Sequence, residues 1–561
     1  MRRRTTGLHR MVVKVPAALT VLALTLVTFV AAGPPPAGAV PTTAGTDFWV
    51  AFSQNYSGAP ALTLFISSGS STSGTVAPTG GTSIPFSVTP GHVATVTIPA
   101  TYEANSADGI ENKGIHVTSK APISVYGLND IEFTTDAFLA LPTSSEGTIY
   151  RTLGYGGDYG GGLTVVATTN GTTVTVTPSE AVGSHAAGVA FTEHLNAGQT
   201  YQLQATSGGD LSGSLVTANH TISVYGYNAC TDVPSSSSAC DTVVEQMPPT
   251  SSWGTEFVSE RLALRHQGDT YRVLADTDNT VVKVDGTTVA TLAAGKFYEA
   301  LLPAGETTAN NDGLEITTSK PALVAEYSNG ESLDSVPSDP MEMLVPPFEQ
   351  FENSYTVATP TGVEAFSPNF INVVVPTPYL FSFRIDGHSV SSSDFKAIGT
   401  SGFSGAQLSV EPGAHTLTDN ANFGAFVYGY AAYNSYGYPA GYTLSPVASV
   451  SKLTLDKPAY SAAVNSNICP IATVKDSNGN ALTGVTVTFT VDKPTAATLT
   501  GVTNSAGQAT VCFTSKVEGT GTLTATAGVQ TSLLTATATV SFGAATTTTV
   551  QTVPATPKFT G

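Results

Sequence analysis

The sequence predicts an all-β protein in which tandem antiparallel β-sandwich repeats precede one further C-terminal sandwich. Short runs alternate apolar residues with Thr, as in residues 163–178, "LTVVATTNGTTVTVTP". Gly and Pro interrupt these runs about every 8–12 residues, a spacing typical of sandwiches and barrels. After residue 40 no stretch keeps a helical period for more than two turns. These observations exclude a helical or a mixed α/β architecture.

The first 39 residues resemble a secretory signal peptide. Residues 2–14 are rich in Arg, residues 15–32 are apolar, and Ala37-Gly38-Ala39 offers a small-residue cleavage site. An uncleaved membrane anchor is the alternative, because the apolar run is at the lower edge of what spans a bilayer. In either case the rest of the chain is expected outside the cytoplasm, as a secreted or cell-surface protein. The export route stays open.

The five letters "ISVYG" mark a repeated unit. They occur at residues 123–127 and 222–226, and related stretches, "ALVAEYSNG" and "AFVYGYAAY", follow at similar intervals. A second marker, such as "LPTSSEGTIY" or "PPTSSWGTEF", comes after each copy but the last. Residues 45–446 therefore predict four repeats of about 100 residues, which we place at 45–146, 147–253, 254–351 and 352–446.

Each repeat is expected to consist of strands and hairpins. Asn170-Gly171 is a strong two-residue hairpin signal, and residues 271–286 occupy the same place in the third repeat. The repeats could form a string of packed sandwiches, each with its own core, or close into a toroid. Units of this length can each bury a core, so the string is the preferred arrangement.

Residues 449–543 predict a single sandwich of a different kind. Its alternating runs are joined by "DSNGN" and "NSAGQA", two Gly-containing turns. Residues 544–561 are rich in Thr and Pro and have little to bury, which predicts a linker or tail.

Composition narrows the class of partner. Charged residues make up 11% of the chain and the formal net charge is −19. No basic patch is left that could follow a phosphate backbone, so nucleic acid is not an expected partner. No apolar segment after the signal is long enough to cross a membrane.

Four cysteines in an exported chain predict two disulfides. Three pairings are possible, and the expected one joins Cys230 to Cys240 and Cys469 to Cys512, because each pair lies within one predicted domain. Loop-closure entropy alone would give about 2.7 kcal/mol for the shorter loop and about 4 kcal/mol for the longer one.

The sequence holds no catalytic or metal-binding motif, so we predict no enzyme activity and no cofactor. HExxH and GxSxG are missing, and His116 and His220 read as ordinary strand residues at related positions. "DTDN" at residues 276–279 lacks the Gly and Glu of an EF-hand and is interpreted as a hairpin turn, with an irregular calcium site as the alternative. Three carboxylates of the first repeat could in principle pair for acid–base chemistry: Asp47, Asp130 and Asp136.

A tyrosine cluster is the candidate binding site. Residues 423–442 read "FGAFVYGYAAYNSYGYPAGY", and the second half resembles an exposed loop. Tyr among Gly and Ser is the composition of binding surfaces, because its ring offers flat amphipathic contact at low entropic cost. The candidates are Tyr433, Tyr436, Tyr438 and Tyr442. The alternative is that these rings fill the junction to the C-terminal sandwich.

Two family resemblances emerge from these motifs. "GTDFWVAF", "NKGIHVTSKAPISVYGLND", "TTDAFLALP" and "EGTIY" together resemble the N-terminal domain of the IgGFc-binding protein family. "VKDSNGNALTGVTVTF" followed by "TNSAGQATVCFTS" is similar to bacterial Ig-like domains of the invasin and intimin type. The second resemblance implies an Ig-like β-sandwich that serves as a spacer or binding module.

The resemblances imply an exported bacterial surface or matrix protein that binds a protein or glycan ligand, such as a mucin-like glycoprotein or an immunoglobulin. They carry over no Fc-contact residue. Two other functions remain as alternatives: a secreted carbohydrate-active enzyme, and a purely structural matrix protein.

Overall fold

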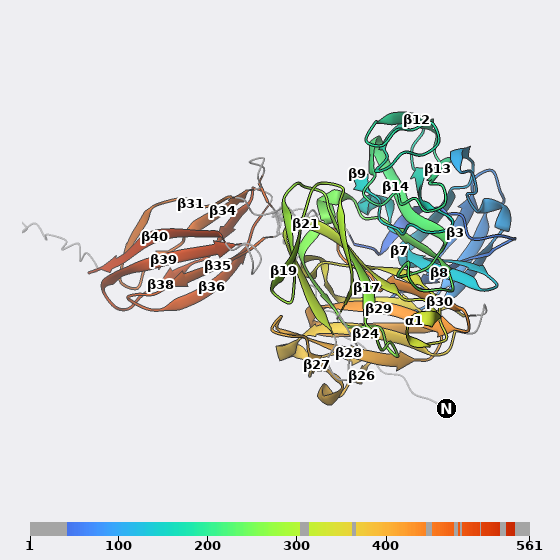
Figure 1. Cartoon of the computed structure of the whole chain (residues 1–561). Coiled ribbons are helices and arrows are strands. Elements are labelled where there is room, and N and C mark those ends of the chain that lie inside the picture. The colour runs from blue at the N-terminus through green and yellow to red at the C-terminus, as the bar shows by residue number, and fades with distance from the viewer. Residues whose placement is uncertain are drawn as a thin grey trace, which may run out of the picture. The chain divides into compact units, whose positions relative to one another are not determined.

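The computed structural model describes residues 42–302, 313–361, 366–444, 452–475, 481–482, 485–504, 506–527 and 534–544. The predicted signal peptide and nearly all of the C-terminal tail lie outside these ranges. Strands dominate the described chain, and they fall into four similar groups followed by a different one (Figure 1). The predicted all-β class, with antiparallel sandwich repeats and an Ig-like domain, is confirmed.

The strands of the four repeats are as follows. The first repeat holds β1 (Gly45–Val50), β2 (Ala61–Ser67), β3 (Thr72–Pro78), β4 (Ile84–Val88), β5 (Ala94–Ile98), β6 (Asp108–Glu111), β7 (Ile115–Ile131) and β8 (Thr134–Leu139). The second holds β9 (Gly147–Arg151), β10 (Gly161–Ala167), β11 (Thr172–Thr177), β12 (Phe191–Leu195), β13 (Thr200–Gln204), β14 (Leu215–Thr231) and β15 (Asp241–Gln246). The third holds β16 (Gly254–Ser259), β17 (Asp269–Ala275), β18 (Thr280–Val284), β19 (Thr287–Leu292), β20 (Phe297–Leu302), β21 (Leu314–Ser328), the short helix α1 (Glu331–Asp334) and β22 (Met341–Val345). The fourth holds β23 (Glu352–Ala358), β24 (Asn369–Pro376), β25 (Arg384–Ile385), β26 (His388–Ser389), β27 (Lys396–Ala397), β28 (Phe403–Val410), β29 (Ala414–Ala431) and β30 (Asn434–Pro439).

One long strand organises each repeat. In the first repeat the leading half of β7 pairs with β1 and β3, and its trailing half pairs with β2 and β8. Strands β14, β21 and β29 play the same part in the later repeats. The "ISVYG" letters form the trailing half of β7 and β14. The sequence repeat is thus a repeat of strand arrangement.

The second sequence marker forms the junction between repeats. Short 3₁₀ turns at Thr143–Ser145, Thr250–Ser252 and Phe348–Gln350 each follow a proline and precede the first strand of the next repeat. Proline fixes the backbone φ and has no N–H, so it suits the residue that enters such a turn. Three further 3₁₀ turns lie within repeats, at Ala100–Tyr102, Thr377–Tyr379 and Ser392–Asp394.

Each hydrophobic core is shared by two neighbouring repeats. The core of the first repeat includes Tyr225 and Tyr227 of the second. Side chains of the second and third repeats form one cluster, and those of the third and fourth form another. The remaining cluster joins the fourth repeat to Tyr126 and Leu128 of the first. The preferred expectation of a string of sandwiches with separate cores is therefore wrong.

The repeats close into a ring because their long strands are buried on both faces. We call the contact between the fourth and first repeats the seam. Residues 125–129 of β7 and 222–231 of β14 are all buried, so both faces of these strands need cover from neighbouring repeats. At the seam, the N–H of Thr43 donates to the carbonyl of Tyr442 at 3.0 Å. The Tyr126 hydroxyl also donates to the carbonyl of Ala440 at 3.0 Å. The four repeats form a closed ring of contacts.

The C-terminal sandwich has a core of its own. Its strands, drawn in orange to red in Figure 1, are β31 (Lys452–Leu455), β32 (Ala459–Ala463), β33 (Asn467–Ile468), β34 (Ile471–Lys475), β35 (Thr486–Val491), β36 (Ala497–Val502), β37 (Gln508–Thr510), β38 (Phe513–Thr514), β39 (Gly519–Ala527) and β40 (Leu534–Gly543). One hydrophobic cluster draws only on this domain. In the part of the chain that is described, no helix is long and apolar enough to span a membrane.

Candidate binding face

A buried carboxylate joins the four repeats at the centre of the ring. Strands β8, β15, β22 and β30 contact one another there. Asp136 on β8 accepts from the N–H groups of Val244 on β15 and Glu342 on β22, both at 3.0 Å. Its other oxygen accepts from Ala137 and, at 3.4 Å, from Gly437 on β30. One side chain thus satisfies backbone donors of all four repeats.

Other central carboxyl groups lie in the same apolar surroundings. Burial raises the pKa of Glu342 to about 8 and the pKa of Glu245 well above its usual range. The Tyr327 hydroxyl donates to one oxygen of Glu342 at 2.9 Å, while the other oxygen has no partner. This pattern suits a protonated carboxyl at neutral pH. The centre of the ring is therefore lined by buried carboxyl groups that hold the repeats together.

The turns that follow the four long strands gather at one end of this centre. We call the turns at residues 131–134, 231–241, 328–341 and 431–434 the hairpin crown. The N–H of Thr135 donates to Asp241 at 2.6 Å, which joins the first turn to the second. The N–H of Gly330 donates to the carbonyl of Val233 at 2.8 Å, which joins the third to the second. Ser435 donates to the carbonyl of Asp339, which joins the fourth to the third.

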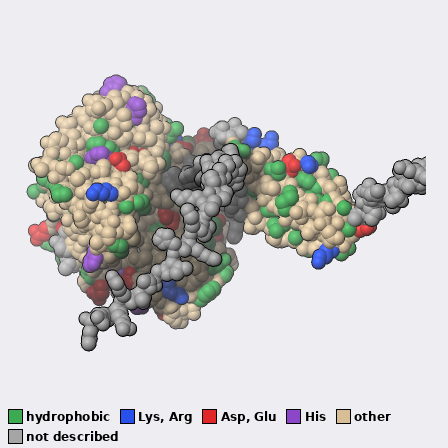
Figure 2. Space-filling view, turned by 180° about the vertical axis from the view of Figure 1, so that it is seen from behind, with side chains coloured by type: hydrophobic (Ala, Val, Ile, Leu, Met, Phe, Trp, Pro, Cys, Tyr) green, Lys and Arg blue, Asp and Glu red, His purple; other side chains and the backbone are tan. Residues whose placement is uncertain are grey.

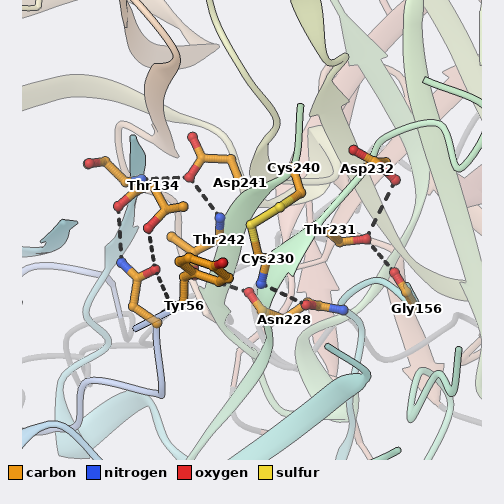
Figure 3. Close-up of a disulfide and its surroundings, with 12 residues drawn as sticks. Tyr56, Thr134, Gly156, Asn228, Cys230, Thr231, Asp232, Cys240, Asp241 and Thr242 are labelled. Atoms are coloured by element: carbon orange, nitrogen blue, oxygen red, sulfur yellow. Dashed lines mark hydrogen bonds between the residues drawn. A yellow bond between two sulfur atoms is a disulfide. The ribbon is translucent and has the colours of Figure 1, made fainter. Parts of the chain in front are cut away.

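A disulfide braces the crown turn of the second repeat, residues 231–241. Cys230 and Cys240 are joined, as the sequence predicts, and the N–H of Cys230 donates to the Asn228 side chain at 2.9 Å (Figure 3). Tyr56 and Thr134 of the first repeat lie beside this disulfide in the same view. The crown is thus held both covalently and by hydrogen bonds between repeats.

Two aromatic side chains occupy equivalent positions in the crown. Phe133 and Tyr433 are each the second residue of a two-residue turn, with φ of 71° and 64°. They are 54% and 50% exposed, and their rings meet edge to face at 5.9 Å. Gly or Asn adopts this left-handed conformation more easily than an aromatic residue does. Leu264, in a loop of the third repeat, is likewise half exposed at φ 70°.

A second aromatic pair extends the surface towards the second repeat. Tyr56 and Tyr159 are 42% and 39% exposed, and their rings meet at 5.0 Å with nearly perpendicular planes. The pKa of Tyr159 is raised, chiefly by its hydrogen bond to Tyr56. Tyr56 follows Asn55, which bonds to the carbonyl of Thr134 at 3.1 Å. A second exposed aromatic pair therefore lies beside the crown.

The crown is acidic in sequence but holds one buried cation, Arg265, whose side chain donates to Ser328, Asn329 and Ser338. Its turns contain several Asp and Glu residues and no Lys or Arg. Burial raises the pKa of Asp232 and, beside the first turn, that of Asp130. Lys and Arg are also few and scattered on the face drawn in Figure 2. An acidic surface with exposed aromatic rings suits a partner that presents cationic and apolar groups.

The structure separates the four predicted tyrosines. Tyr433 is exposed in the crown, but Tyr436, Tyr438 and Tyr442 are buried, so the expectation of an exposed loop is wrong for these three. The Tyr436 hydroxyl donates to Asn369 at 2.6 Å, and the Tyr438 ring stacks on Tyr126 at 4.5 Å. The rings fill the seam between the fourth and first repeats, whereas the sequence-based alternative placed them at the C-terminal sandwich.

The other predicted residues are dispersed. Asp47 Oδ2 lies 3.0 Å from His116 Nε2, Asp130 accepts from the Thr135 hydroxyl at 3.0 Å, and Asp136 is buried at the centre of the ring. Residues 276–279 connect β17 to β18, but these strands pair with β21 and not with each other, so the predicted hairpin is wrong. The hairpin predicted at Asn170-Gly171 is wrong for the same reason, since β10 and β11 both pair with β14. The pairing of Cys469 with Cys512 is confirmed.

Phe133, Tyr56 and Tyr159 were not predicted. Phe133 lies in the turn that directly follows the "ISVYG" strand β7, and Tyr56 and Tyr159 precede β2 and β10, the partners of the "ISVYG" strands, so these positions could have been found from the repeat.

Comparison with known proteins identifies both parts of the chain. A family model described as IgGFc binding protein matches residues 136–429, more than half of the chain. The chain belongs to the IgGFc-binding protein family. A second model, described as a bacterial Ig-like domain of group 1, matches residues 450–553. Both resemblances inferred from the sequence are therefore confirmed.

The family relatives differ greatly in length. The human IgGFc-binding protein is 29% identical over 423 residues, which cover 72% of this chain and 8% of the relative. Among solved structures, the D00-D0 domain of intimin is 23% identical and covers 34% of this chain and 92% of its own, with a TM-score of 0.15. A tetra-tandem repeat of a large adhesion protein is 13% identical and covers 75% of this chain and 96% of its own, with a TM-score of 0.15.

Proposed function

We propose that this member of the IgGFc-binding protein family is an exported adhesion or binding protein, secreted or attached to a cell surface. In this proposal the hairpin crown binds a protein or glycoprotein ligand, and the C-terminal Ig-like sandwich acts as a spacer or second binding module. Two disulfides suit an oxidising extracellular environment. The matched families are binding and adhesion domains, which favours binding over catalysis.

The observation that carries the proposal is the pair Phe133 and Tyr433. Exposed aromatic rings are unfavourable on a surface without a partner, and left-handed backbone adds strain of about 1 kcal/mol at each residue. Both costs recur at the same turn position in two repeats. Aromatic residues with this exposure are the usual anchors of protein interfaces. A binding role explains why the turns keep aromatic residues where Gly would be easier.

A direct binding measurement tests the proposal. Residues 40–561 would be passed over immobilised mucin, immunoglobulin G and a basic matrix glycoprotein at low and high salt. We expect saturable binding to at least one ligand that weakens with salt, because the crown is acidic. The double variant Phe133→Ala, Tyr433→Ala should weaken this binding at least about tenfold, which corresponds to about 1.4 kcal/mol.

A matched control separates the crown from general surface effects. Ile149 on β9 and Val289 on β19 are 49% and 36% exposed and lie away from the crown turns. The variant Ile149→Ala, Val289→Ala should bind as the parent does. Equal losses in both double variants, or no binding to any of the three ligands, would count against the crown and favour a purely structural matrix role.

A further inference from the structure

One connection in the fourth repeat departs from its counterparts. The turn from β2 to β3 reads "SGSS", that from β10 to β11 reads "TTNG", and that from β17 to β18 reads "DTDN". The equivalent link from β24 to β25 is longer and reads "TPYLFSF". Short polar turns suffice to connect these strands in three repeats, so the added aromatic residues of the fourth are not needed for the connection itself.

The longer link forms one wall of a surface pocket. The pocket has a volume of about 370 Å³, enough for one small ligand. It is lined by Phe381, Ser382, Arg384, Thr418, Asp419 and Asn420. Phe381 is 72% exposed, the highest value among the large hydrophobic side chains of the described residues. Its ring offers a flat apolar surface next to polar groups.

A buried carboxylate oxygen without a partner lines the same pocket. Asp419 is 8% exposed, and one of its oxygens accepts from the Ser382 hydroxyl and from the N–H of Asn420. The other oxygen is buried and has no hydrogen-bond partner. A carboxylate can accept more hydrogen bonds than these two, so a ligand hydroxyl would find an acceptor in Asp419.

A guanidinium completes the set of groups. Arg384 donates to the carbonyl oxygens of Phe381 at 2.9 Å and Phe383 at 2.8 Å, which ties its side chain to the aromatic link. The pocket thus combines a hydroxyl acceptor in Asp419, a donor group in Arg384 and a flat ring in Phe381.

We propose that this pocket binds a neutral pyranose sugar. A sugar ring has an apolar face that can lie on Phe381, and each of its hydroxyls both donates and accepts. One hydroxyl would donate to Asp419 and a neighbouring one would accept from Arg384. With one carboxylate and one guanidinium, the pocket carries no net charge that would favour an acidic or a basic sugar over a neutral one. The pocket is separate from the hairpin crown and does not depend on the function proposed for it.

Saturation-transfer NMR on residues 40–561 tests this site. The probes are the methyl pyranosides of glucose, galactose, mannose and N-acetylglucosamine, with methyl glucuronide and sialic acid as acidic comparisons. We expect at least one neutral pyranoside to bind at millimolar concentration and neither acidic sugar to bind more tightly than it does. Phe381→Ala and Asp419→Asn should each weaken that binding at least about tenfold, or 1.4 kcal/mol.

The control is Ile149→Ala, which removes an exposed apolar side chain outside both the pocket and the crown and should leave sugar binding unchanged. Phe381 is so exposed that its replacement should not disturb folding, which keeps the test valid if Asp419→Asn proves unstable. Three results would overturn the proposal: no neutral sugar binds, Phe381→Ala binds as the parent does, or the acidic sugars bind better than the neutral ones.

Discussion

The four-repeat ring and the C-terminal sandwich are both antiparallel β-structure, yet they use their cores in opposite ways. Every hydrophobic cluster of the ring combines side chains of two repeats, and Asp136 satisfies backbone donors of all four. The cluster of the sandwich draws on that domain alone. Similar strands can therefore make either an interdependent assembly or an independent domain, according to which faces remain to be covered.

Dissecting the chain should show the largest difference between the two regions. We expect residues 449–543 to fold alone, with a cooperative thermal transition. Residues 45–351, which lack the fourth repeat, should not fold, because two of the four ring clusters lose one partner. Circular dichroism and amide exchange of the two fragments would measure this. A stable, cooperative fragment 45–351 would show that the repeats are separate domains after all.

Removing the central carboxylate should weaken the ring alone. Asp136→Ala leaves buried N–H groups on β8, β15 and β22 without their acceptor. Since each such group costs about 1–3 kcal/mol, we expect a loss of about 3 kcal/mol or more in the unfolding free energy of the ring. Calorimetry would detect it as a lower ring transition beside an unchanged sandwich transition. Equal melting of variant and parent would refute the role of Asp136.

The two disulfides allow a comparison of the stability that each contributes to its own region. Replacing Cys469 and Cys512 by Ala opens a loop of 43 residues and should destabilise the sandwich by about 4 kcal/mol. Replacing Cys230 and Cys240 opens a loop of 10 residues and should destabilise the ring by only about 2.7 kcal/mol. Urea unfolding of the two double variants gives both numbers. The reverse order would show that the crown depends on its disulfide more than loop entropy predicts.

The response to pH should also distinguish the two regions. The pKa of Glu342 rises from an ordinary 4.5 to about 8 on folding because the group is buried. Its protonated form is therefore favoured by folding, so this contribution is complete below pH 4.5 and is lost as the pH rises to about 8. The ring should melt at a higher temperature at pH 5 than at pH 8.5.

The sandwich has no Asp or Glu among its described buried residues, so its transition should change little over the same interval. Glu342→Gln should reduce the pH dependence of the ring without abolishing it, since an amide keeps the bond from Tyr327 without titrating while Glu245 and Glu146 still titrate. If the slope of melting temperature against pH is the same in parent and variant, then Glu342 is not its source.

The sequence by itself determined the strands, the four-fold repeat, the junction turns and both disulfides. These features depend on local patterns: alternation with a period of two, Gly and Pro at turns, and cysteines within one domain. The sequence could not determine which strands would have both faces buried by neighbouring repeats. Tyr436 and Tyr433 lie three residues apart among the same small polar neighbours, yet one is buried in the seam and the other is half exposed in the crown.

Only the tertiary structure decided that difference. When both faces of a strand are covered, even its polar residues are buried in the core. The covering residues come from a repeat that is remote in sequence. Closure of the ring buries Tyr436, Tyr438 and Tyr442 and places Asp136 among donors from three other repeats. The same closure assembles the crown, because it brings together turns that lie about 100 residues apart in the chain.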